Sequence, residues 1–326
     1  MVADTDSSLS EKELLAVVDI GSNSVRMNIY NIDRKTGDFT VVDSSRAMLK
    51  LASYISDGAM SADGEGKLYT VMREYLAKAN SVPCDRFIAF ATASLRGLST
   101  TERTIERIKQ GLGVDISIIS GEDEARYDYE ATCRRFGNAM ADRGIVIDMG
   151  GGSTEFIAFD HDRIHHLTSL PIGSLALWRN FVKKNDTFPT PSECDDIAKY
   201  VSEQMNIADQ LESYGGTAYL IGGTARAISR IDAKLQDRKD QLDGYEMSFE
   251  RFFDIADFAI KDVEDGAPTL KKLCGDRLTS IIPGVIAYRE IIRLTGVSRA
   301  VVSLSGVREG FLASLIRRDH RSIREF

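Results

Sequence analysis

The stretch "VVDIGSNSVRMNIY", from Val17 to Tyr30, places an aspartate, a glycine and small polar residues between two apolar segments. "VIDMGGGSTEFIAF", from Val146 to Phe159, repeats this pattern. An offset of 129 residues superposes Asp19 on Asp148, together with the glycine and serine positions that follow them. One repeat at so long a period is typical of a duplicated domain and not of a solenoid. We therefore expect two related half-molecules with a ligand cleft between them.

Apolar runs of strand character alternate with helical patterns along the chain, which is typical of an α/β fold. In the first half we expect strands at 15–20, 25–32, 39–48, 86–92 and 114–120 and helices at 61–80 and 101–112. In the second half we expect strands at 144–150, 154–160, 163–171, 217–223 and 299–305, helices at 122–136 and 192–214, an all-helical stretch at 248–296 and a closing helix. Both halves thus begin with three meandering strands and continue with helix and strand in alternation.

Length and composition restrict the class of protein. A chain of 326 residues is about right for two domains. It has no run of 18 apolar residues, and its acidic start lacks the layout of a signal peptide, so we expect neither a membrane span nor secretion. The four cysteines are scattered and form no CxxC pair. We therefore expect no disulfide framework or zinc site, and a cytoplasmic protein.

The net charge of −8 argues against a nucleic-acid binder, because neutralising many phosphates needs a basic face. It does not exclude a small polyanion, which needs only a local positive pocket inside an acidic protein.

Each repeated loop has the composition of a phosphate-binding turn. Glycine permits backbone conformations that aim successive N–H groups at one anion, and serine or threonine adds hydroxyl donors. The candidates are Gly21, Ser22, Asn23 and Ser24 in the first loop and Gly151, Gly152, Ser153 and Thr154 in the second. A tight hairpin that needs glycine for geometry alone is the alternative for one loop, but two matching loops favour phosphate.

A third glycine loop follows the strand "AYLIGG". Gly223 and Thr224 there lead into a helix, and a helix N-terminus attracts anions, although glycine before a helix is also common.

Two aspartates end their strands at equivalent points beside these loops. Asp19 and Asp148 would repel bound phosphates unless a cation lay between them. Mg²⁺ resolves that conflict, because it binds through one or two carboxylates plus water and phosphate oxygens. Glu155, seven residues past Asp148, could join the same metal site. The alternative is that these acids only cap turns through backbone N–H groups.

The segment that joins the two halves is rich in acids. Glu122, Asp123 and Glu124 lie in the first turn of the expected helix, where carboxylates stabilise the helix dipole. Because this segment lies between the halves, one acid could also take a proton from an attacking water. Arg96, at the end of the strand in "FATASLRG", suits bidentate phosphate binding; a surface arginine without a role is the alternative.

Taken together, these segments resemble the exopolyphosphatase/guanosine pentaphosphate phosphatase family, within the actin, Hsp70 and sugar kinase superfamily. The resemblance extends from about Leu15 to Leu312. Its motifs, in chain order, are "DIGSNSVRM", "ATASLR", "SGEDEARY", "DMGGGSTE", "LPIGSLAL", "IGGTARAI" and "LSGVREGFL".

The resemblance implies a fold, a set of roles and a partner. The fold would be two ribonuclease-H-like (actin-like ATPase) domains around a cleft, at 1–121 with about 308–326 and at 122–307 with a helical insertion. Glu124, directly before Ala-Arg, would be the catalytic glutamate that activates water. Asp148 and Glu155 match the family's magnesium-associated acids, and Arg96 matches its phosphate-gripping arginine. A homodimer is also implied.

The expected activity is magnesium-dependent removal of the terminal phosphate from inorganic polyphosphate, without a covalent enzyme intermediate. A close alternative is guanosine pentaphosphate as substrate, which the sequence does not separate from polyphosphate. A kinase or ATPase of the same superfamily would need an adenosine pocket around Gly222–Arg226. A sensor that only binds guanosine tetra- or pentaphosphate would not need Glu124, Asp148 and Glu155 beside the anion.

Overall fold

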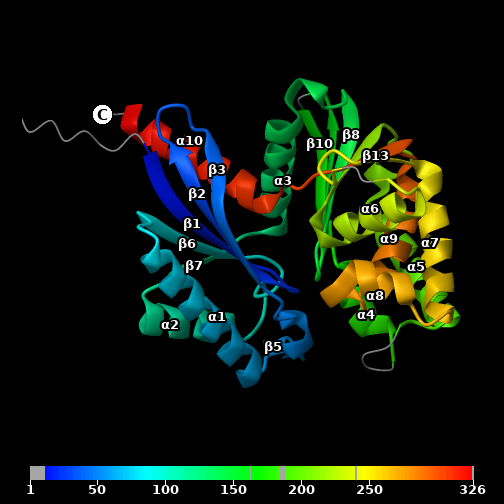
Figure 1. Cartoon of the computed structure of the whole chain (residues 1–326), viewed down its shortest axis with the longest axis horizontal. Helices are drawn as coiled ribbons and strands as arrows, with labels where there is room; N and C mark the ends of the chain where they lie inside the picture. Colours follow the sequence, from blue (N-terminus) through cyan, green and yellow to red (C-terminus); the bar gives the residue numbers. More distant parts are fainter. Residues whose placement is uncertain (1–11, 162, 184–187, 239–240, 325–326) are drawn as a thin grey trace, which may run out of the picture.

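Two β-sheets organise the chain, one in each of two lobes (Figure 1). The computed structural model describes residues 12–161, 163–183, 188–238 and 241–324. The first sheet has the order β3-β2-β1-β6-β7 and the second the order β10-β9-β8-β11-β13-β12. The strands of the first sheet are β1 (Lys12–Ile20), β2 (Val25–Asp33), β3 (Phe39–Ala47), β6 (Arg86–Ala91) and β7 (Ile116–Ile118). Those of the second are β8 (Arg143–Met149), β9 (Thr154–Asp160), β10 (Arg163–Leu170), β11 (Thr217–Ile221), β12 (Glu246–Ser248) and β13 (Arg299–Val302).

The two sheets begin in the same way, which agrees with the repeat in the sequence. In the first, β1 pairs antiparallel with β2 and parallel with β6; in the second, β8 pairs antiparallel with β9 and parallel with β11. Asp19 lies opposite Arg26 across the first hairpin, and Asp148 lies opposite Glu155 across the second. The expected α/β organisation is confirmed.

Helices cover both faces of the first sheet. On one face, Ala16 and Val18 pack in a cluster with Leu68 of α1 (Ala62–Ser81), next to α2 (Thr101–Leu112). On the other face, Leu15 packs in a cluster with Leu312 of α10 (Val307–Arg324). This division follows from the alternation of side chains along a strand. A small hairpin of β4 (Ile55–Ser56) and β5 (Ala59–Met60) precedes α1.

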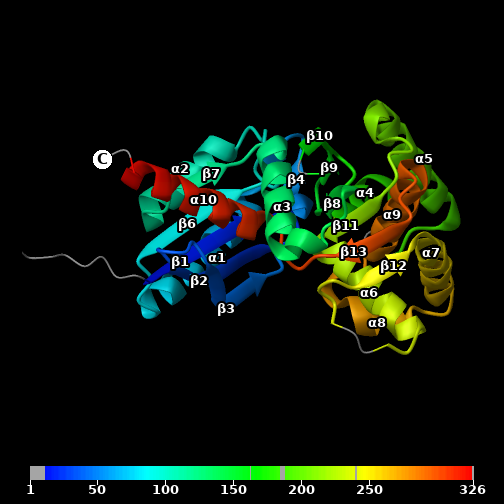
Figure 2. The ribbon, with the colours of Figure 1, turned by 90° about the horizontal axis from the view of Figure 1, so that it is seen from above.

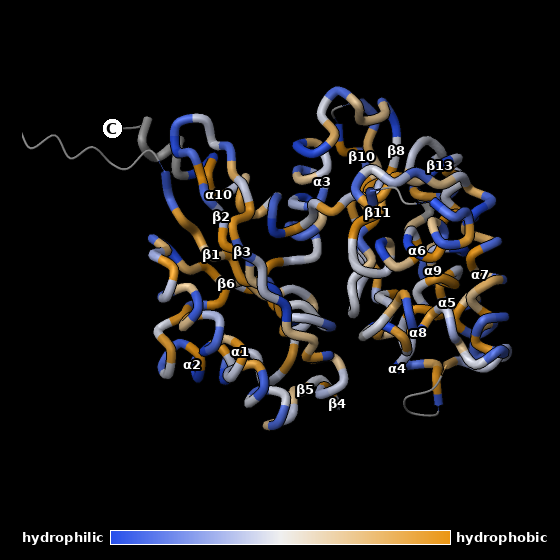
Figure 3. The backbone as a smooth tube through the Cα atoms, viewed as in Figure 1, coloured by the Kyte–Doolittle hydropathy of each residue, from blue (hydrophilic) through white to orange (hydrophobic). Residues whose placement is uncertain are grey.

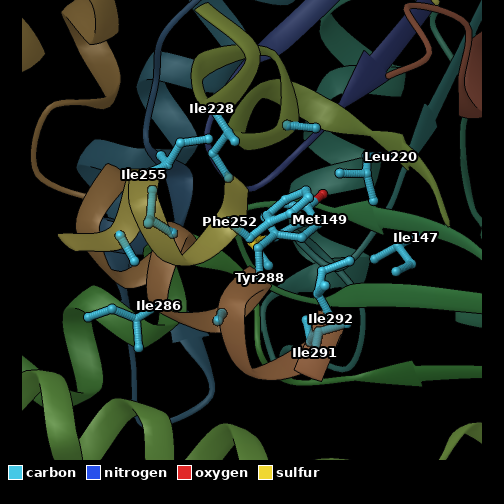
Figure 4. Packing of buried hydrophobic residues seen from close by; sticks show 14 of the residues in the cluster. Ile147, Met149, Leu220, Ile228, Phe252, Ile255, Ile286, Tyr288, Ile291 and Ile292 are labelled. Atoms are coloured by element: carbon cyan, nitrogen blue, oxygen red, sulfur yellow. The ribbon is translucent and has the colours of Figure 1, made fainter. Parts of the chain in front are cut away.

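A thick helical layer covers one face of the second sheet (Figure 1), and its core gathers most of the buried apolar residues of this lobe. The layer consists of α4 (Ser174–Phe181), α5 (Pro191–Ile207), α6 (Gly222–Leu235), α7 (Phe249–Glu264), α8 (Pro268–Cys274) and α9 (Ile281–Thr295). In Figure 4, Met149 and Leu220 of the sheet pack with Phe252 and Tyr288 of the helices. The Tyr288 hydroxyl donates to the carbonyl oxygen of Ile221 at 3.3 Å, which fixes the end of β11 just before α6 begins. Colouring by hydropathy shows apolar residues along the strands of both lobes (Figure 3).

Helix α3 (Gly121–Phe136) lies where the two lobes meet, beside α10 (Figure 2). Ala125 of α3 packs on the second sheet, on the face opposite the helical layer. At Gly310 of α10, a Cβ would collide with the backbone of Tyr127, so this glycine allows α10 to approach α3 closely. Helix α3 therefore packs between the second sheet and α10.

Three expectations about local structure differ from what the structure shows. The helix expected at 192–214 ends at Ile207, because Ala208 leaves the helical conformation (φ −101°, ψ 52°) and the next turn buries Leu211 in the core. The strand expected at 114–120 shrinks to β7, because Ser120 is the N-cap of α3 and its hydroxyl accepts from the Asp123 N–H at 3.0 Å. The strand expected at 299–305 ends at Val302. None of the helices in the described ranges is long and apolar enough to cross a membrane.

Candidate active site

The two repeated loops and the start of α6 meet at one pocket. It is lined by the first loop, Gly21–Ser24, by the second loop, Gly150–Ser153, and by Gly222 and Gly223, and its volume is about 110 Å³. The lining thus combines a turn of the first lobe with two turns of the second. The structure brings together the loops that the sequence places far apart.

The two loops touch each other through their glycines. A Cβ on Gly152 would lie 2.8 Å from the hydroxyl oxygen of Ser22, and a Cβ on Gly151 would lie 3.2 Å from the backbone nitrogen of Asn23. Glycine at these positions is therefore needed for the close approach of the lobes.

Asn23 offers a polar group that the protein itself does not use. Its side chain is buried, and neither Nδ2 nor Oδ1 has a hydrogen-bond partner among the residues that the structure describes. Buried amides are normally hydrogen-bonded. Because Asn23 lines the pocket, its donor and acceptor are available to a ligand there.

Glu124 is the one acid of the α3 first turn that lines the pocket; Glu122 and Asp123 are exposed. Arg96 Nη2 donates to Glu124 Oε2 at 2.7 Å, and Arg96 Nε donates to the carbonyl oxygen of Ile119 at 3.0 Å. Arg96 itself does not line the pocket, so in this structure it holds the glutamate and does not reach a ligand position.

The electrostatic surroundings of Glu124 suit a proton acceptor. Burial raises its pKa well above the usual range, the neighbouring Glu155 and Asp148 raise it further, and Arg96 opposes them. A carboxylate whose pKa is raised is a stronger proton acceptor once it is deprotonated. The arrangement therefore provides a carboxylate able to take a proton from water inside the pocket.

Three arginines on the pocket wall are absent from the sequence predictions. Arg26 of β2, Arg226 of α6 and Arg277 have no carboxylate within 4.0 Å in the described part of the chain. Burial, together with the repulsion of Arg26 and Arg277, lowers the pKa of Arg226 to about 9. Such a cluster of unpaired guanidinium groups is strongly complementary to a polyanion.

The profile of the Ppx/GppA phosphatase family matches residues 29–319. The chain belongs to this family. It is 32% identical to Exopolyphosphatase 1 of Mycobacterium tuberculosis, and equally to that of Mycobacterium bovis, over 169 residues, which are 52% of this chain and 48% of the relative. The match therefore spans about half the length of these curated relatives. The resemblance seen in the sequence is confirmed.

Solved structures of Ppx/GppA proteins share the fold over nearly the whole chain. The family member of Aquifex aeolicus has a TM-score of 0.75 at 23% identity and covers 94% of this chain and 99% of its own. An exopolyphosphatase of Cytophaga hutchinsonii has a TM-score of 0.81 at 18% identity and covers 94% and 98%. The expected fold of two ribonuclease-H-like domains is confirmed.

The carboxylates expected to bind a metal differ in their surroundings in this Ppx/GppA chain. Asp148 lines the pocket and has no basic partner within 4.0 Å among the described residues; burial raises its pKa to about 6. Asp19 also lines the pocket, but Arg308 Nη1 lies 3.7 Å from its Oδ2. Glu155 lies outside the lining and accepts from the Ser169 hydroxyl at 2.7 Å.

These surroundings restrict how a metal could be held. In the described ranges, no three His, Cys, Asp or Glu side chains are arranged to hold a metal ion. Mg²⁺ needs only one or two carboxylates when water and substrate phosphates supply the other ligands. Asp19 of the first lobe and Asp148 of the second both line the pocket and fit this small donor set.

Two of the predicted phosphate ligands of the family loops lie outside the lining. The hydroxyl of Thr154 donates to the carbonyl oxygen of Ile172 at 3.0 Å, and Thr224 is buried against Gly284. Both threonines thus hold the second lobe together at the base of the loops.

One further acid, Asp128, is absent from the sequence predictions. It lies one turn after Glu124 on α3, it is fully buried, and neither carboxyl oxygen has a hydrogen-bond partner within the described chain. Burial raises its pKa well above the usual range, and Asp148 and Glu124 raise it further. Only its spacing of four residues from Glu124 could have indicated that both point to the same side of the helix.

Proposed function

We propose that this chain is an exopolyphosphatase, which hydrolyses the terminal phosphoanhydride bond of inorganic polyphosphate. The observation that carries the proposal is one pocket that holds a buried carboxylate, Glu124, beside glycine loops and three unpaired arginines. The membership in a phosphatase family and the likeness to Exopolyphosphatase 1 of Mycobacterium tuberculosis support it.

The terminal phosphate would be held by donors that are already in place. These donors would be backbone N–H groups of both loops, the amide of Asn23, and the guanidinium groups of Arg26, Arg226 and Arg277, since all these residues line the pocket. Because the pocket is partly closed to water, these charges act more strongly than they would in bulk solvent. Positioning and charge stabilisation supply most of the catalysis in phosphoryl transfer.

Glu124 would act on the attacking water. The water oxygen forms a bond to the terminal phosphorus, the bond from phosphorus to the bridging oxygen breaks, and the proton of the water passes to Glu124. Arg96 keeps the carboxylate in place through its 2.7 Å hydrogen bond. No covalent enzyme intermediate is required.

Magnesium is part of the proposal. Asp148 of the second lobe and Asp19 of the first, which both line the pocket, would hold the ion. When bound, Mg²⁺ neutralises negative charge on the phosphate oxygens. This role explains why carboxylates line a pocket that is otherwise suited to anions.

The size of the pocket favours recognition of an end group. Its volume of about 110 Å³ is well below the roughly 300–1,000 Å³ of pockets that enclose a drug-sized ligand. A terminal phosphate fits this space. Guanosine pentaphosphate is the second candidate substrate, because it ends in the same chemical group.

The test is release of inorganic phosphate from polyphosphates of several lengths, guanosine pentaphosphate and ATP, each with Mg²⁺ and with EDTA. We expect magnesium-dependent release from polyphosphate and none from ATP. Phosphate release from guanosine pentaphosphate alone would identify that compound as the substrate in place of polyphosphate. Tight binding of either compound without release would identify a sensor, and ATP consumption only with an added acceptor would identify a kinase.

A further inference from the structure

Each phosphate loop rests on a separate support behind it. The second loop rests on the start of α4, where the Ser174 N–H donates to the Gly150 carbonyl at 3.1 Å and the next two N–H groups donate to that of Gly151. Gly173 packs so closely on this loop that a Cβ there would lie 2.5 Å from the carbonyl carbon of Gly152. Helix α4 and the second loop therefore form one unit.

The first loop rests on a short segment of its own lobe. The Lys50 N–H donates to the Asn23 carbonyl at 2.8 Å, and the Ala52 N–H donates to the Ser22 carbonyl at 3.1 Å. These contacts attach the loop to the 3₁₀ turn Leu51–Tyr54. This turn and the first loop form a second unit, which belongs to the other lobe.

Arg179, in the last turn of α4, joins the two units. Its Nη1 donates to the carbonyl oxygen of Ala52, and its Nη2 donates to that of Ile55 at 2.6 Å. Ala52 is thus bound on both sides, by the first loop through its N–H and by α4 through its carbonyl. The Ala52 carbonyl also accepts from the Ile55 N–H, which closes the turn, and the carbonyl of Ile55 lies directly after the turn. A guanidinium fork suits two such neighbouring carbonyls, because its N–H donors can bind both at once.

We propose that Arg179 is a positioning residue that holds the lobes in the arrangement in which the two phosphate loops touch. Arg179 does not line the pocket, and it has no carboxylate within 4.0 Å in the described part of the chain. Its hydrogen bonds go from one lobe to the backbone of the other, and both ends are attached to a phosphate loop. It therefore acts through the loops and not on the substrate.

The consequence for turnover rests on the proposed function. If loss of Arg179 leaves only a fraction of the molecules with the loops in contact, the apparent affinity for substrate falls to that fraction of its wild-type value. Saturating substrate restores the contact. We expect the KM for polyphosphate to rise about tenfold in Arg179→Ala, with kcat changed by less than about twofold. Arg179→Lys should give an intermediate KM, because one ammonium replaces a fork that binds two carbonyls.

The experiment compares Arg179→Ala and Arg179→Lys with Lys199→Ala, which removes an exposed cation whose partner among the described residues, Glu203, lies in the same helix. Hydrogen exchange without substrate is measured first, so this readout does not depend on the proposed activity. We expect faster exchange confined to residues 21–25 and 50–56 in the Arg179 variants, and the increase in KM described above. The proposal is overturned if exchange in these two segments is unchanged in the Arg179 variants, or if it is faster while the KM stays the same. It is also overturned if Lys199→Ala has the same effects. If wild-type protein releases no phosphate, the exchange result alone decides it.

Discussion

Arg96 Nη2 lies 2.7 Å from Glu124 Oε2, and this pair joins the turn that follows β6 in the first lobe to the first turn of the helix between the lobes. The sequence places Arg96 at the end of the strand, but β6 ends at Ala91. The sequence predicts that both residues belong to the site, but with independent roles: Arg96 would bind phosphate and Glu124 would activate water. In the structure they form one unit, because the guanidinium that would hold phosphate holds the carboxylate.

Glu124→Gln should lower kcat for phosphate release by at least about a hundredfold, since a general base typically contributes 10²–10⁴-fold. The amide keeps the shape of the side chain, so the dissociation constant for polyphosphate should change little. Steady-state kinetics and equilibrium binding check the two halves of this prediction. The control is Glu122→Gln, two residues away on the exposed side of α3, which should behave as wild type. Lost binding in Glu124→Gln would make Glu124 a structural or metal residue.

Arg96→Ala should move the acid limb of the pH profile of kcat/KM to higher pH. The pKa of Glu124 is already raised by burial and by Glu155 and Asp148, and Arg96 is the charge that opposes this shift. Without Arg96 the carboxyl stays protonated to a higher pH, so less of the enzyme carries the base at neutral pH. Arg96→Lys, which keeps a positive charge, should shift the limb less. If the acid limb does not move in Arg96→Ala, Arg96 does not control the protonation of Glu124.

Gly223→Ala should weaken substrate binding through Arg277. The guanidinium of Arg277 lies against Gly223, and a Cβ there would collide with it. Displacing one charge-assisted contact of about 1.5–3 kcal/mol should raise the KM for polyphosphate by roughly 10- to 100-fold. The matched control is Gly66→Ala in α1, where a Cβ meets nothing within 4 Å. If Gly223→Ala and wild type have equal KM values, Arg277 does not contribute to substrate binding.

Asp128→Asn should make the protein more stable at neutral pH and leave it nearly unchanged near pH 4. The pKa of Asp128 is raised in the folded state, so its charge disfavours folding, and stability falls as pH rises from its ordinary value of about 3.9 toward the raised one. The variant has no carboxyl group to ionise, so it avoids this loss of stability, which amounts to about 1.4 kcal/mol for each unit of pKa shift. Urea unfolding of the variant and the wild type at pH 4 and pH 8 measures the difference in their free energy of unfolding. A difference that is the same at both pH values would mean that Asp128 does not ionise differently on folding.

The duplicated fold could be predicted because each of the two repeated motifs is a short continuous stretch of sequence. The repeat of Asp19 as Asp148, with glycine and serine at matching distances, defines two hairpins, and the structure shows both with the same pairing. The position of Arg26 opposite Asp19 could also have been found by counting across the first turn.

The rest of the site depends on contacts between distant segments. Arg277 comes from a short turn between two helices, and nothing in the sequence around it indicates that it reaches Gly223. Arg308 faces Asp19 only because α10 returns from the second lobe to the first sheet. Arg179 and Ala52 are likewise joined only by the way the lobes pack.

The most direct test of the proposed function is hydrolysis of polyphosphate in ¹⁸O-labelled water with Mg²⁺, followed by mass analysis of the released phosphate and of the remaining chains. The account predicts inorganic phosphate that carries one ¹⁸O atom, chains that shorten from their ends, and loss of both in Glu124→Gln. Chains cut into internal fragments, phosphate without label, or undiminished release by Glu124→Gln would contradict it.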